Sequence, residues 1–333
     1  MSIDYPLYTG STDLALEANE LVSRRLGTDV TGIKQSYDED HGIKVTLLDI
    51  ETDDAAASLG KLKGHYVTLE VPGLRKKDSS LQDRVATRFA KEFAEFLKRV
   101  GIGADDRVLI VGLGNGHVTA DALGPIVVEN MLVTRQYFEL MPDQVHPGYR
   151  EVSAVAPGVL GTTGIESSEI VQGIVEQTSP DLVIAIDALA SRSLERVNTT
   201  IQIADTGIHP GSGIGNKRKG LTQDILGVPV IAIGVPTVVY ASTIVDSSID
   251  MMVDHFQKQT KKTVSILGLL EQLNNGERLA LVREVLNPMG QDLLVTPKEI
   301  DQFIEDIANI IASGLNAALH EAIDSGNVAA YTH

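Results

Sequence analysis

The sequence predicts an α/β protein: a largely parallel sheet flanked by helices, with a small antiparallel β-rich extension. Near-continuous apolar runs at residues 107–114, 181–189, 228–236 and 292–296 alternate with helical patterns. Strands that are apolar on both faces are typical of a parallel sheet covered by helices. A chain of 333 residues is expected to form one main domain with a smaller appended layer.

The N-terminal part predicts a helix followed by the extension. Apolar residues recur at helical spacing over residues 12–25, behind a Ser-Thr-Asp start in which Thr12 is the expected cap. Residues 30–72 then contain three short β-rich runs separated by turn-type residues, which predicts an antiparallel meander. A charged helix follows, with apolar residues every three or four positions from Val85 to Val100, and it is expected to end at Gly101.

The last apolar run, at 292–296, leads into a predicted C-terminal helix. Thr296 and Glu299 have the spacing of a capping box, and Pro297 occupies the first expected helical position. The apolar residues from Ile300 to Leu315 form a stripe that is expected to face the core.

Composition narrows the function. The chain has no Cys, which excludes a cysteine peptidase and disulfides. Its net charge of −17 disfavours contact with a phosphate backbone, so no direct nucleic-acid binding is expected. We find neither a secretion signal nor an apolar run of about 18 residues. A soluble protein that is not secreted and has no membrane contact is therefore expected.

Two aspartates follow apolar runs of the predicted sheet. Asp121 lies in the loop after the run at 107–114, and Asp187 ends the apolar stretch 182–186. In open α/β sheets, ligands collect outside the carboxyl ends of the strands. If the two strands are neighbours, the carboxylates face each other and one retains its proton. The pair then holds a base for water and an acid for a carbonyl, which is the equipment for peptide hydrolysis without a metal or a thiol.

Structural roles for the same residues stay open. Asp121 or Thr119 can cap the helix that follows the glycine-rich loop, and Arg192 or Arg196 can be an ion-pair partner of Asp187. The eight histidines show no zinc-peptidase spacing, so no metal and no cofactor are expected.

Three short patterns resemble other sites without completing them. Gly112 and Gly114 begin a dinucleotide fingerprint whose third glycine is replaced by His117. The triplet Asp205-Thr206-Gly207 matches aspartic proteases of all-β fold, but it occurs once in a chain with too many helices for that fold.

The stretch 211–217 resembles a phosphate loop, but Asn216 stands where a glycine is required before the lysine. We interpret it as a mobile loop in which Gly211 and Gly213 contact substrate. His117 and His209 lie in loops near the predicted crevice and are further candidates for substrate contact.

Longer motifs make the chain resemble one family. The stretches VGLGNGHVTADALGP, APGVLGTTGIESSEI, DLVIAIDALASRSLERVNTTIQIADTGIHPGSGIGNKRKG, VPVIAIGVPTVV and the terminal AAYTH are similar to those of the germination proteases, or spore proteases, of endospore-forming bacteria. The resemblance runs over nearly the whole chain. It implies an atypical aspartic endopeptidase of the forespore and spore core, which is cytoplasmic and degrades small acid-soluble spore proteins during germination. The family's two essential aspartates match Asp121 and Asp187.

The resemblance also implies assembly and activation. Family members form homotetramers and are made as zymogens that remove a short N-terminal piece themselves. Residues Asp13 to Glu17 resemble the acidic–apolar–Ala–x–Glu sites cut in the substrates. We therefore expect cleavage between Asp13 and Leu14, with residues 1–13 as propeptide and residues 14–333 as a single catalytic domain.

The family is similar in fold to hydrogenase maturation peptidases, whose glycine-rich loop resembles residues 112–124. Those relatives use a metal. A metal-assisted peptidase of that type, and a binding module without enzymatic activity, are the two alternatives.

Overall fold

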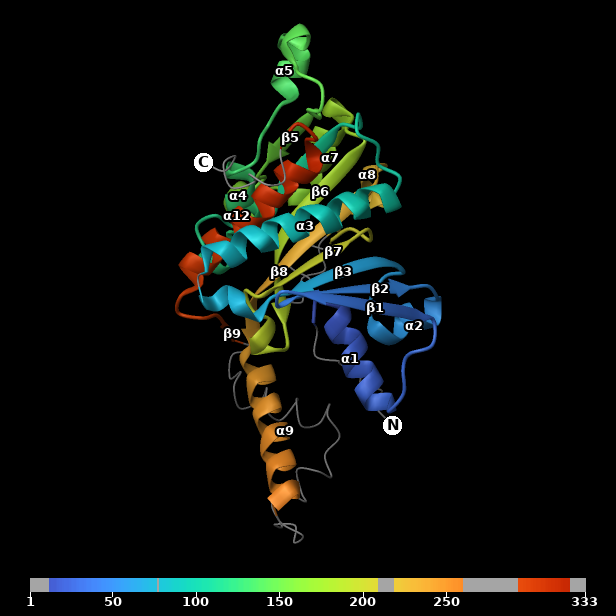
Figure 1. Ribbon diagram of the computed structural model, residues 1–333, viewed down its shortest axis with the longest axis vertical. Coiled ribbons are helices and arrows are strands. Elements are labelled where there is room, and N and C mark those ends of the chain that lie inside the picture. The colour runs from blue at the N-terminus through green and yellow to red at the C-terminus, as the bar shows by residue number, and fades with distance from the viewer. Residues whose placement is uncertain (1–11, 77, 209–218, 260–292, 324–333) are drawn as a thin grey trace.

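The computed structural model describes residues 12–76, 78–208, 219–259 and 293–323, and one mixed sheet runs through it (Figure 1). The strand order is β1-β2-β3-β7-β8-β6-β4-β5, with β9 paired to β8. The strands are β1 (Ile33–Asp40), β2 (Ile43–Ile50), β3 (Gly64–Glu70), β4 (Val108–Gly112), β5 (Val152–Val155), β6 (Leu182–Ser191), β7 (Thr200–Ala204), β8 (Val230–Tyr240) and β9 (Leu294–Val295).

Helices connect the strands, and short 3₁₀ turns lie between several elements. The α-helices are α1 (Ala15–Leu26), α2 (Asp53–Leu59), α3 (Ser79–Arg99), α4 (Leu123–Glu129), α5 (Arg135–Leu140), α6 (Leu160–Thr163), α7 (Ser167–Thr178), α8 (Gln223–Leu226), α9 (Ala241–Gln259) and α12 (Ile300–Leu319). The 3₁₀ turns are η1 (Pro72–Lys76), η2 (Thr119–Asp121), η3 (Pro142–Gln144) and η4 (Leu194–Arg196).

The predicted α/β class is confirmed. Strands β8, β6, β4 and β5 pair in parallel, while β1, β2, β3 and β7 pair antiparallel. Strand β7, which the sequence analysis missed, joins the two halves because it is antiparallel to both β3 and β8. The meander is thus the outer part of the same sheet. Strand β5 was also missed, since a strand of four residues, of which three are half-buried, gives little periodic signal.

The run at 292–296 was wrongly predicted as a strand of the parallel sheet. Only Leu294 and Val295 pair, and they pair antiparallel with the end of β8. Leu293 and Leu294 are 61% and 45% exposed. An apolar run therefore proved a poor indicator of a buried strand here.

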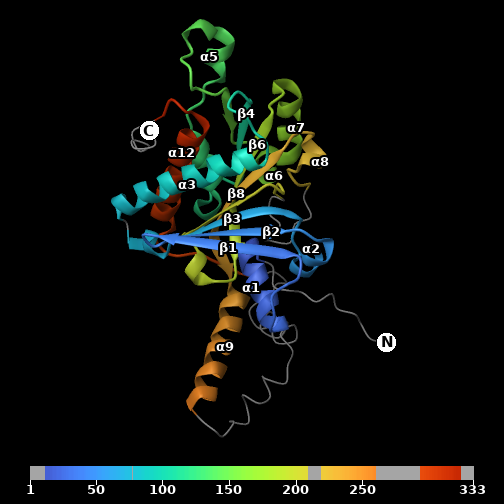
Figure 2. The ribbon, with the colours of Figure 1, turned by 45° about the vertical axis from the view of Figure 1, so that its right-hand side comes forward.

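Helices cover both faces of the sheet (Figure 2). On one face α3, α4 and α12 pack on alternate strand residues, such as Val108 and Ile110 of β4. On the other face α7 and α8 pack against Leu109 and Val111. Helices α1 and α2 cover the meander on a third cluster, which includes Leu48. Helix α5 and helix α9 project at opposite ends of the molecule (Figure 1).

The helix starts differ from the predicted ones. The N-cap of α1 is Leu14, and the hydroxyl of Thr12 accepts a hydrogen bond from the Leu14 amide at 3.2 Å. Helix α12 begins at Ile300 without the predicted capping box, since the Thr296 hydroxyl donates to the Thr237 carbonyl instead. Its core-facing stripe is confirmed by the burial of Ile300, Ile304, Ile307, Ile311 and Leu315.

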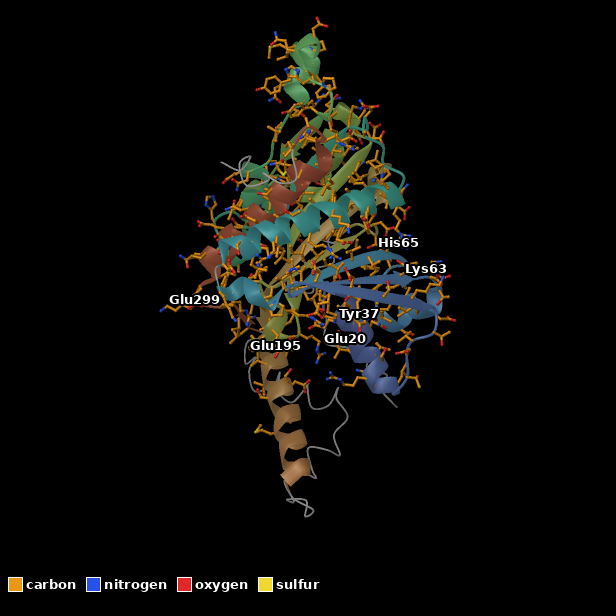
Figure 3. The ribbon with its side chains drawn as sticks, in the orientation of Figure 1. Glu20, Tyr37, Lys63, His65, Glu195 and Glu299 are labelled. Atoms are coloured by element: carbon orange, nitrogen blue, oxygen red, sulfur yellow. The ribbon has the colours of Figure 1, made fainter. Side chains whose placement is uncertain are left out.

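Ion pairs tie α1 to the loop after β6. Arg196 of that loop contacts Glu20 of α1 at 2.8 Å and Glu70 of β3 at 3.0 Å. Glu20 and Glu195 mark this region below the meander in Figure 3. The ion pairs raise the pKa of Arg196 against the opposing effect of its burial. Within the described ranges, no helix is both long enough and apolar enough to cross a bilayer.

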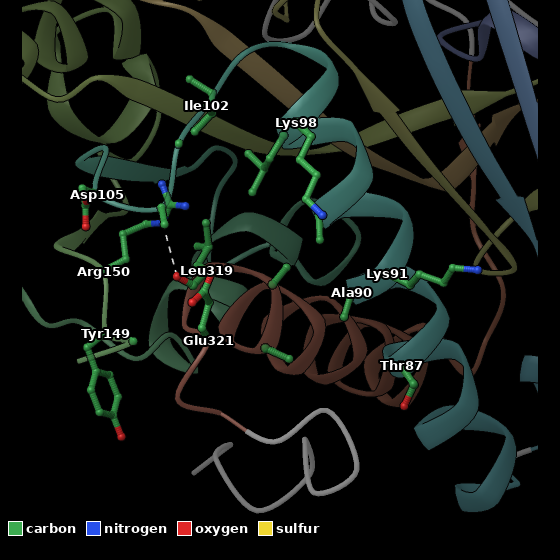
Figure 4. Close-up of a pocket in the computed structure, with 17 residues that line it drawn as sticks. Thr87, Ala90, Lys91, Lys98, Ile102, Asp105, Tyr149, Arg150, Leu319 and Glu321 are labelled. Carbon is green, nitrogen blue, oxygen red and sulfur yellow. Dashed lines mark hydrogen bonds between the residues drawn. The ribbon is translucent and has the colours of Figure 1, made fainter. Parts of the chain in front are cut away.

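A buried histidine caps the C-terminal end of α12. His320 has no exposed surface, and its Nδ1 accepts a hydrogen bond from the backbone N–H of Arg150 at 3.1 Å. The Arg150 guanidinium donates to the Leu319 carbonyl in the same region (Figure 4). Burial lowers the pKa of His320 to about 4, with a further contribution from the Arg150 charge and partial opposition from the backbone of Leu132.

This histidine predicts an acid-dependent loss of stability. Below about pH 6.5 the unfolded chain binds a proton at His320 that the folded chain does not bind until about pH 4. The free energy of unfolding is therefore expected to fall by up to about 3 kcal/mol between these pH values on account of His320 alone. His320→Gln is expected to remove this part of the slope in urea unfolding series, whereas His146→Gln, at an exposed position, leaves it in place. Equal slopes for the wild type and His320→Gln would contradict the prediction.

Candidate active site

Asp187 lies inside β6 rather than at its end. Strand β4 ends at Gly112, which is paired with Ile186, whereas β6 continues beside β8 as far as Ser191. Asp187 is thus the first residue of β6 beyond the end of β4. Its side chain is 6% exposed, and one carboxylate oxygen accepts a hydrogen bond from the Ala188 amide at 2.9 Å.

Asp121 lies on the loop that follows β4. It ends the 3₁₀ turn η2, which lies against β6 and β8. The Thr237 hydroxyl of β8 donates to the Ala120 carbonyl at 2.7 Å and fixes the turn to the sheet. The Asp121 carboxylate accepts a hydrogen bond from the Asn115 amide at 2.8 Å. Both predicted aspartates therefore lie just beyond the carboxyl end of β4.

The glycines of this loop permit close approaches. A Cβ on Gly112 would lie 2.2 Å from the Gly124 carbonyl oxygen, so strand β4 and helix α4 meet backbone to backbone. Gly114 has φ +111°, and a Cβ there would lie 2.0 Å from the Asp121 carbonyl oxygen. These glycines therefore determine where the turn carrying Asp121 can lie.

The other predicted contact residues are only partly described. His117 is exposed on the loop after β4, and its backbone N–H donates to the Asn115 side chain at 3.0 Å. His209, Gly211 and Gly213 lie outside the described residues. Among the two arginines considered as partners of Asp187, Arg196 pairs with the glutamates of α1 and β3. Arg192 contacts Asp246 at 3.3 Å.

The predicted cleavage site lies against the end of β6. The Asp13 amide donates to the Ala190 carbonyl at 3.1 Å, and the Ala190 amide donates to the Asp13 carboxylate at 2.8 Å. Leu14 has no exposed surface and packs in the cluster that contains Val111 and Leu189. The 13–14 peptide bond is therefore part of the folded molecule, on the sheet face covered by α7 and α8.

The next residues are held by side chains that the sequence analysis missed. Lys61 donates to the Thr12 carbonyl at 2.7 Å, and Gln202 accepts from the Ala15 amide at 2.7 Å. Burial lowers the pKa of Lys61, while Asp13 and Glu17 oppose this shift.

Glu17 fixes α1 to the loop directly after the strand that carries Asp187. Its carboxylate accepts hydrogen bonds from the backbone N–H groups of Arg192 and Ser193, at 2.9 and 2.8 Å, and from the Thr12 hydroxyl. The side chain is 4% exposed. An acidic residue in the first turn of a helix is a recognisable signal, but it does not reveal partners about 175 positions away.

A cavity of about 770 Å³ lies between α3 and α12 (Figure 4). Its polar lining includes Lys91, Lys98, Asp105, Arg150 and Glu321. It borders the residues that precede β4, whereas the two aspartates follow the end of that strand. The cavity is therefore separate from the candidate active site. Across the described part of the chain, no three His, Asp or Glu residues gather in a way that could hold a metal ion.

Comparison with known proteins gives sequence relatives along the whole chain. A family model described as germination protease matches residues 11–265 and 257–332. The germination protease of Bacillus cytotoxicus is 50% identical over 364 aligned residues, which cover 99% of each chain. That of a Geobacillus species is 48% identical over 370 aligned residues, covering 100% of this chain and 99% of the relative.

Among solved structures, the NiFe hydrogenase maturation protease HycI from Thermococcus kodakarensis aligns with 63% of this chain and 92% of its own length. The TM-score is 0.31 and the sequence identity is 18%.

The loop geometry predicts a selective effect of adding one methyl group. Gly114→Ala is expected to lower the free energy of unfolding by roughly 1–3 kcal/mol, because the new Cβ meets the Asp121 backbone at an unfavourable φ. Gly116→Ala is the matched control, since its nearest neighbour, Pro125, is 3.6 Å away. Urea unfolding measures both effects, and hydrogen exchange at the Asn115 amide reports whether the turn has opened. Equal stability of the two variants would refute this account of the loop.

Proposed function

Because the chain belongs to the germination protease family and is therefore a peptidase, we propose that Asp121 and Asp187 hydrolyse the peptide bond. One observation carries this proposal: both aspartates lie just beyond the carboxyl end of β4, one in β6 and one on a turn fixed to β8. This is the region of an α/β sheet where substrates bind.

In the proposed mechanism the two carboxyl groups share one proton. The ionised group accepts a proton from water as the water oxygen attacks the substrate carbonyl carbon. The protonated group donates a hydrogen bond to the carbonyl oxygen, which carries the developing negative charge. When the carbon–nitrogen bond breaks, the amide nitrogen takes up the proton that the first carboxyl group accepted from water, and it leaves as an amine. The other product is a carboxylic acid.

We propose small acid-soluble spore proteins as the substrates, degraded during germination in the cytoplasm of the spore core, where the forespore has deposited the enzyme. The sequence relatives are named germination proteases, which supports a role in spores. The net charge of −17 fits action on protein rather than on nucleic acid. A homotetramer is the proposed assembly.

Self-processing is proposed at the Asp13–Leu14 bond. Asp13 pairs with Ala190, three residues beyond Asp187 on the same strand, which corresponds to roughly 10 Å along an extended chain. The 13–14 bond is thus near the proposed catalytic carboxylates of the same molecule. Because Leu14 is fully buried, this segment has to shift before the bond reaches them.

The mechanism predicts the effect of removing either acid. Asp121→Asn and Asp187→Asn are each expected to lower kcat for a small acid-soluble spore protein at least about 1,000-fold, because the side-chain carboxamide of Asn can act neither as a base nor as an acid. The loss is measured by discontinuous assay of cleaved substrate, with circular dichroism to confirm that each variant is folded.

Asp205→Asn is the matched control for these variants. Asp205 belongs to the protease-like triplet at 205–207, but it accepts a hydrogen bond from the His65 backbone in the meander and has no role in the proposed reaction. The activity of this variant is expected to stay within about threefold of that of the wild type. Chelators are expected to leave the proteolytic activity unchanged. Full activity of a folded Asp121→Asn or Asp187→Asn chain would refute the two-aspartate mechanism. Inhibition by a chelator would favour a metal-assisted peptidase.

The cleavage assignment predicts one product of defined mass. Mild acidification or drying of the full chain is expected to yield a protein that lacks residues 1–13 and begins at Leu14, as measured by intact-mass spectrometry. The Asp187→Asn chain under the same treatment is expected to retain its full mass. Loss of any other N-terminal length would refute the assigned bond, while processing of Asp187→Asn would show that another protease cuts it.

A further inference from the structure

Strand β6 has an edge that β4 does not cover. Its pairing with β4 ends at Ile186, while its pairing with β8 continues to Ser191. Among the strands that the structure describes, residues 187–191 therefore pair on one side only. This stretch starts at Asp187, so the uncovered edge begins at a proposed catalytic residue.

The backbone groups of alternate residues point toward this edge. The Ile186 carbonyl accepts a hydrogen bond from the Leu113 amide, just past the end of β4. Because backbone groups alternate between the two sides of a strand, Ala188 and Ala190 present theirs on the same side. The Ala188 amide donates to the side chain of Asp187, and Ala190 pairs with Asp13 through both its amide and its carbonyl.

The contact of Asp13 with Ala190 is made by one short segment rather than by a strand. Its amide donates to the Ala190 carbonyl as a paired strand would, but its carboxylate, rather than a backbone carbonyl, accepts from the Ala190 amide. Asp13 therefore makes the two hydrogen bonds to Ala190 that one residue of a paired strand would make. If residues 1–13 are removed, both backbone groups of Ala190 lose this partner.

We propose that the edge of β6 at residues 187–191 binds the main chain of a polypeptide substrate as an added strand, and that Asp13 fills the Ala190 position before processing. Main-chain pairing gives affinity that is largely independent of sequence, and side chains on alternate residues add selectivity. A substrate strand on this edge runs from Ala190 toward Asp187, so its backbone reaches the proposed catalytic carboxylates. This inference rests on the proposed peptidase function and adds the binding mode of its substrate.

The test is a binding measurement that needs no catalysis. The probe is a fluorescein-labelled peptide with the sequence of residues 4–13, DYPLYTGSTD, which contains no assigned cleavage site. The full-length Asp13→Pro chain lacks both the N–H and the carboxylate that occupy Ala190, so it is expected to bind the peptide at least about tenfold more tightly than the full-length wild type in fluorescence anisotropy. A scrambled peptide of the same composition is the control, and it is expected to bind the two chains with equal affinity.

Backbone methylation then tests strand addition directly. Single N-methyl groups are placed on the peptide amides at positions 9 to 13. Methylation at positions 13 and 11 is expected to weaken binding at least about tenfold, and methylation at position 12 less than about twofold, because only alternate amides point toward β6. If the Asp13→Pro chain does not fold, the same series of methylated peptides is measured with the wild-type chain at higher protein concentration, and the alternating pattern decides the question.

Equal binding by the two chains together with a methylation effect that does not alternate would overturn the inference. Loss of proteolysis in every assay with the alternating pattern intact would instead overturn the proposed peptidase function and leave the binding edge standing.

Discussion

The arrangement of the site depends on one mismatch in strand length. Strand β6 pairs with β4 only as far as Ile186, but it continues along β8 to Ser191. Because β4 stops there, Asp187 is the first residue of β6 that β4 does not flank, and the chain after β4 is free to turn back through η2 with Asp121. Had β4 continued as far as β6 does, the backbone of residues 187–191 would be flanked by strands on both sides, and the turn carrying Asp121 would lie further along the sheet. The position of the acid is thus set by where a neighbouring strand ends.

Near the end of β6, buried polar groups attach the N-terminal segment to the sheet. Glu17 is almost fully buried and is held by two backbone amides, a hydroxyl and, at 3.6 Å, the guanidinium of Arg196. Burial of a carboxylate is tolerated only with such compensation. These contacts join α1 to the loop directly after β6, so the N-terminal segment and the strand that carries Asp187 are mechanically linked. The ion pairs of Arg196 with Glu20 and Glu70 extend the link to the meander.

Much of the fold could be predicted from local patterns, and the failures have physical causes. Strands β4, β6 and β8 were predicted from near-continuous apolar runs. The three strands of the meander and the stripe of α12 were predicted from the spacing of residues within each segment. Strands β5 and β7 were missed because they are short. Helix α2 was missed because its start depends on the Thr52 cap, whose hydroxyl accepts a hydrogen bond from the Ala55 amide. The sequence predicted that Asp121 and Asp187 follow apolar strands, and the structure places both beyond the end of β4, while their part in catalysis stays a proposal. The roles of Glu17, Lys61 and Gln202 could not be predicted, because their hydrogen-bond partners are distant in the chain. Their contacts exist only after the sheet has formed.

The pairing of β7 with both β3 and β8 has a consequence for how the molecule comes apart. Since hydrogen bonds run without interruption from β1 to β5, the meander cannot swing as a separate lobe, and the described sheet is expected to melt in a single cooperative transition. A chain shortened to start after β3 would leave β7 as an unprotected outer strand with buried apolar residues such as Ile201 and Ile203. Such a strand invites edge-to-edge association between copies. The N-terminal meander therefore covers the edge of β7 and protects the rest of the sheet from such association.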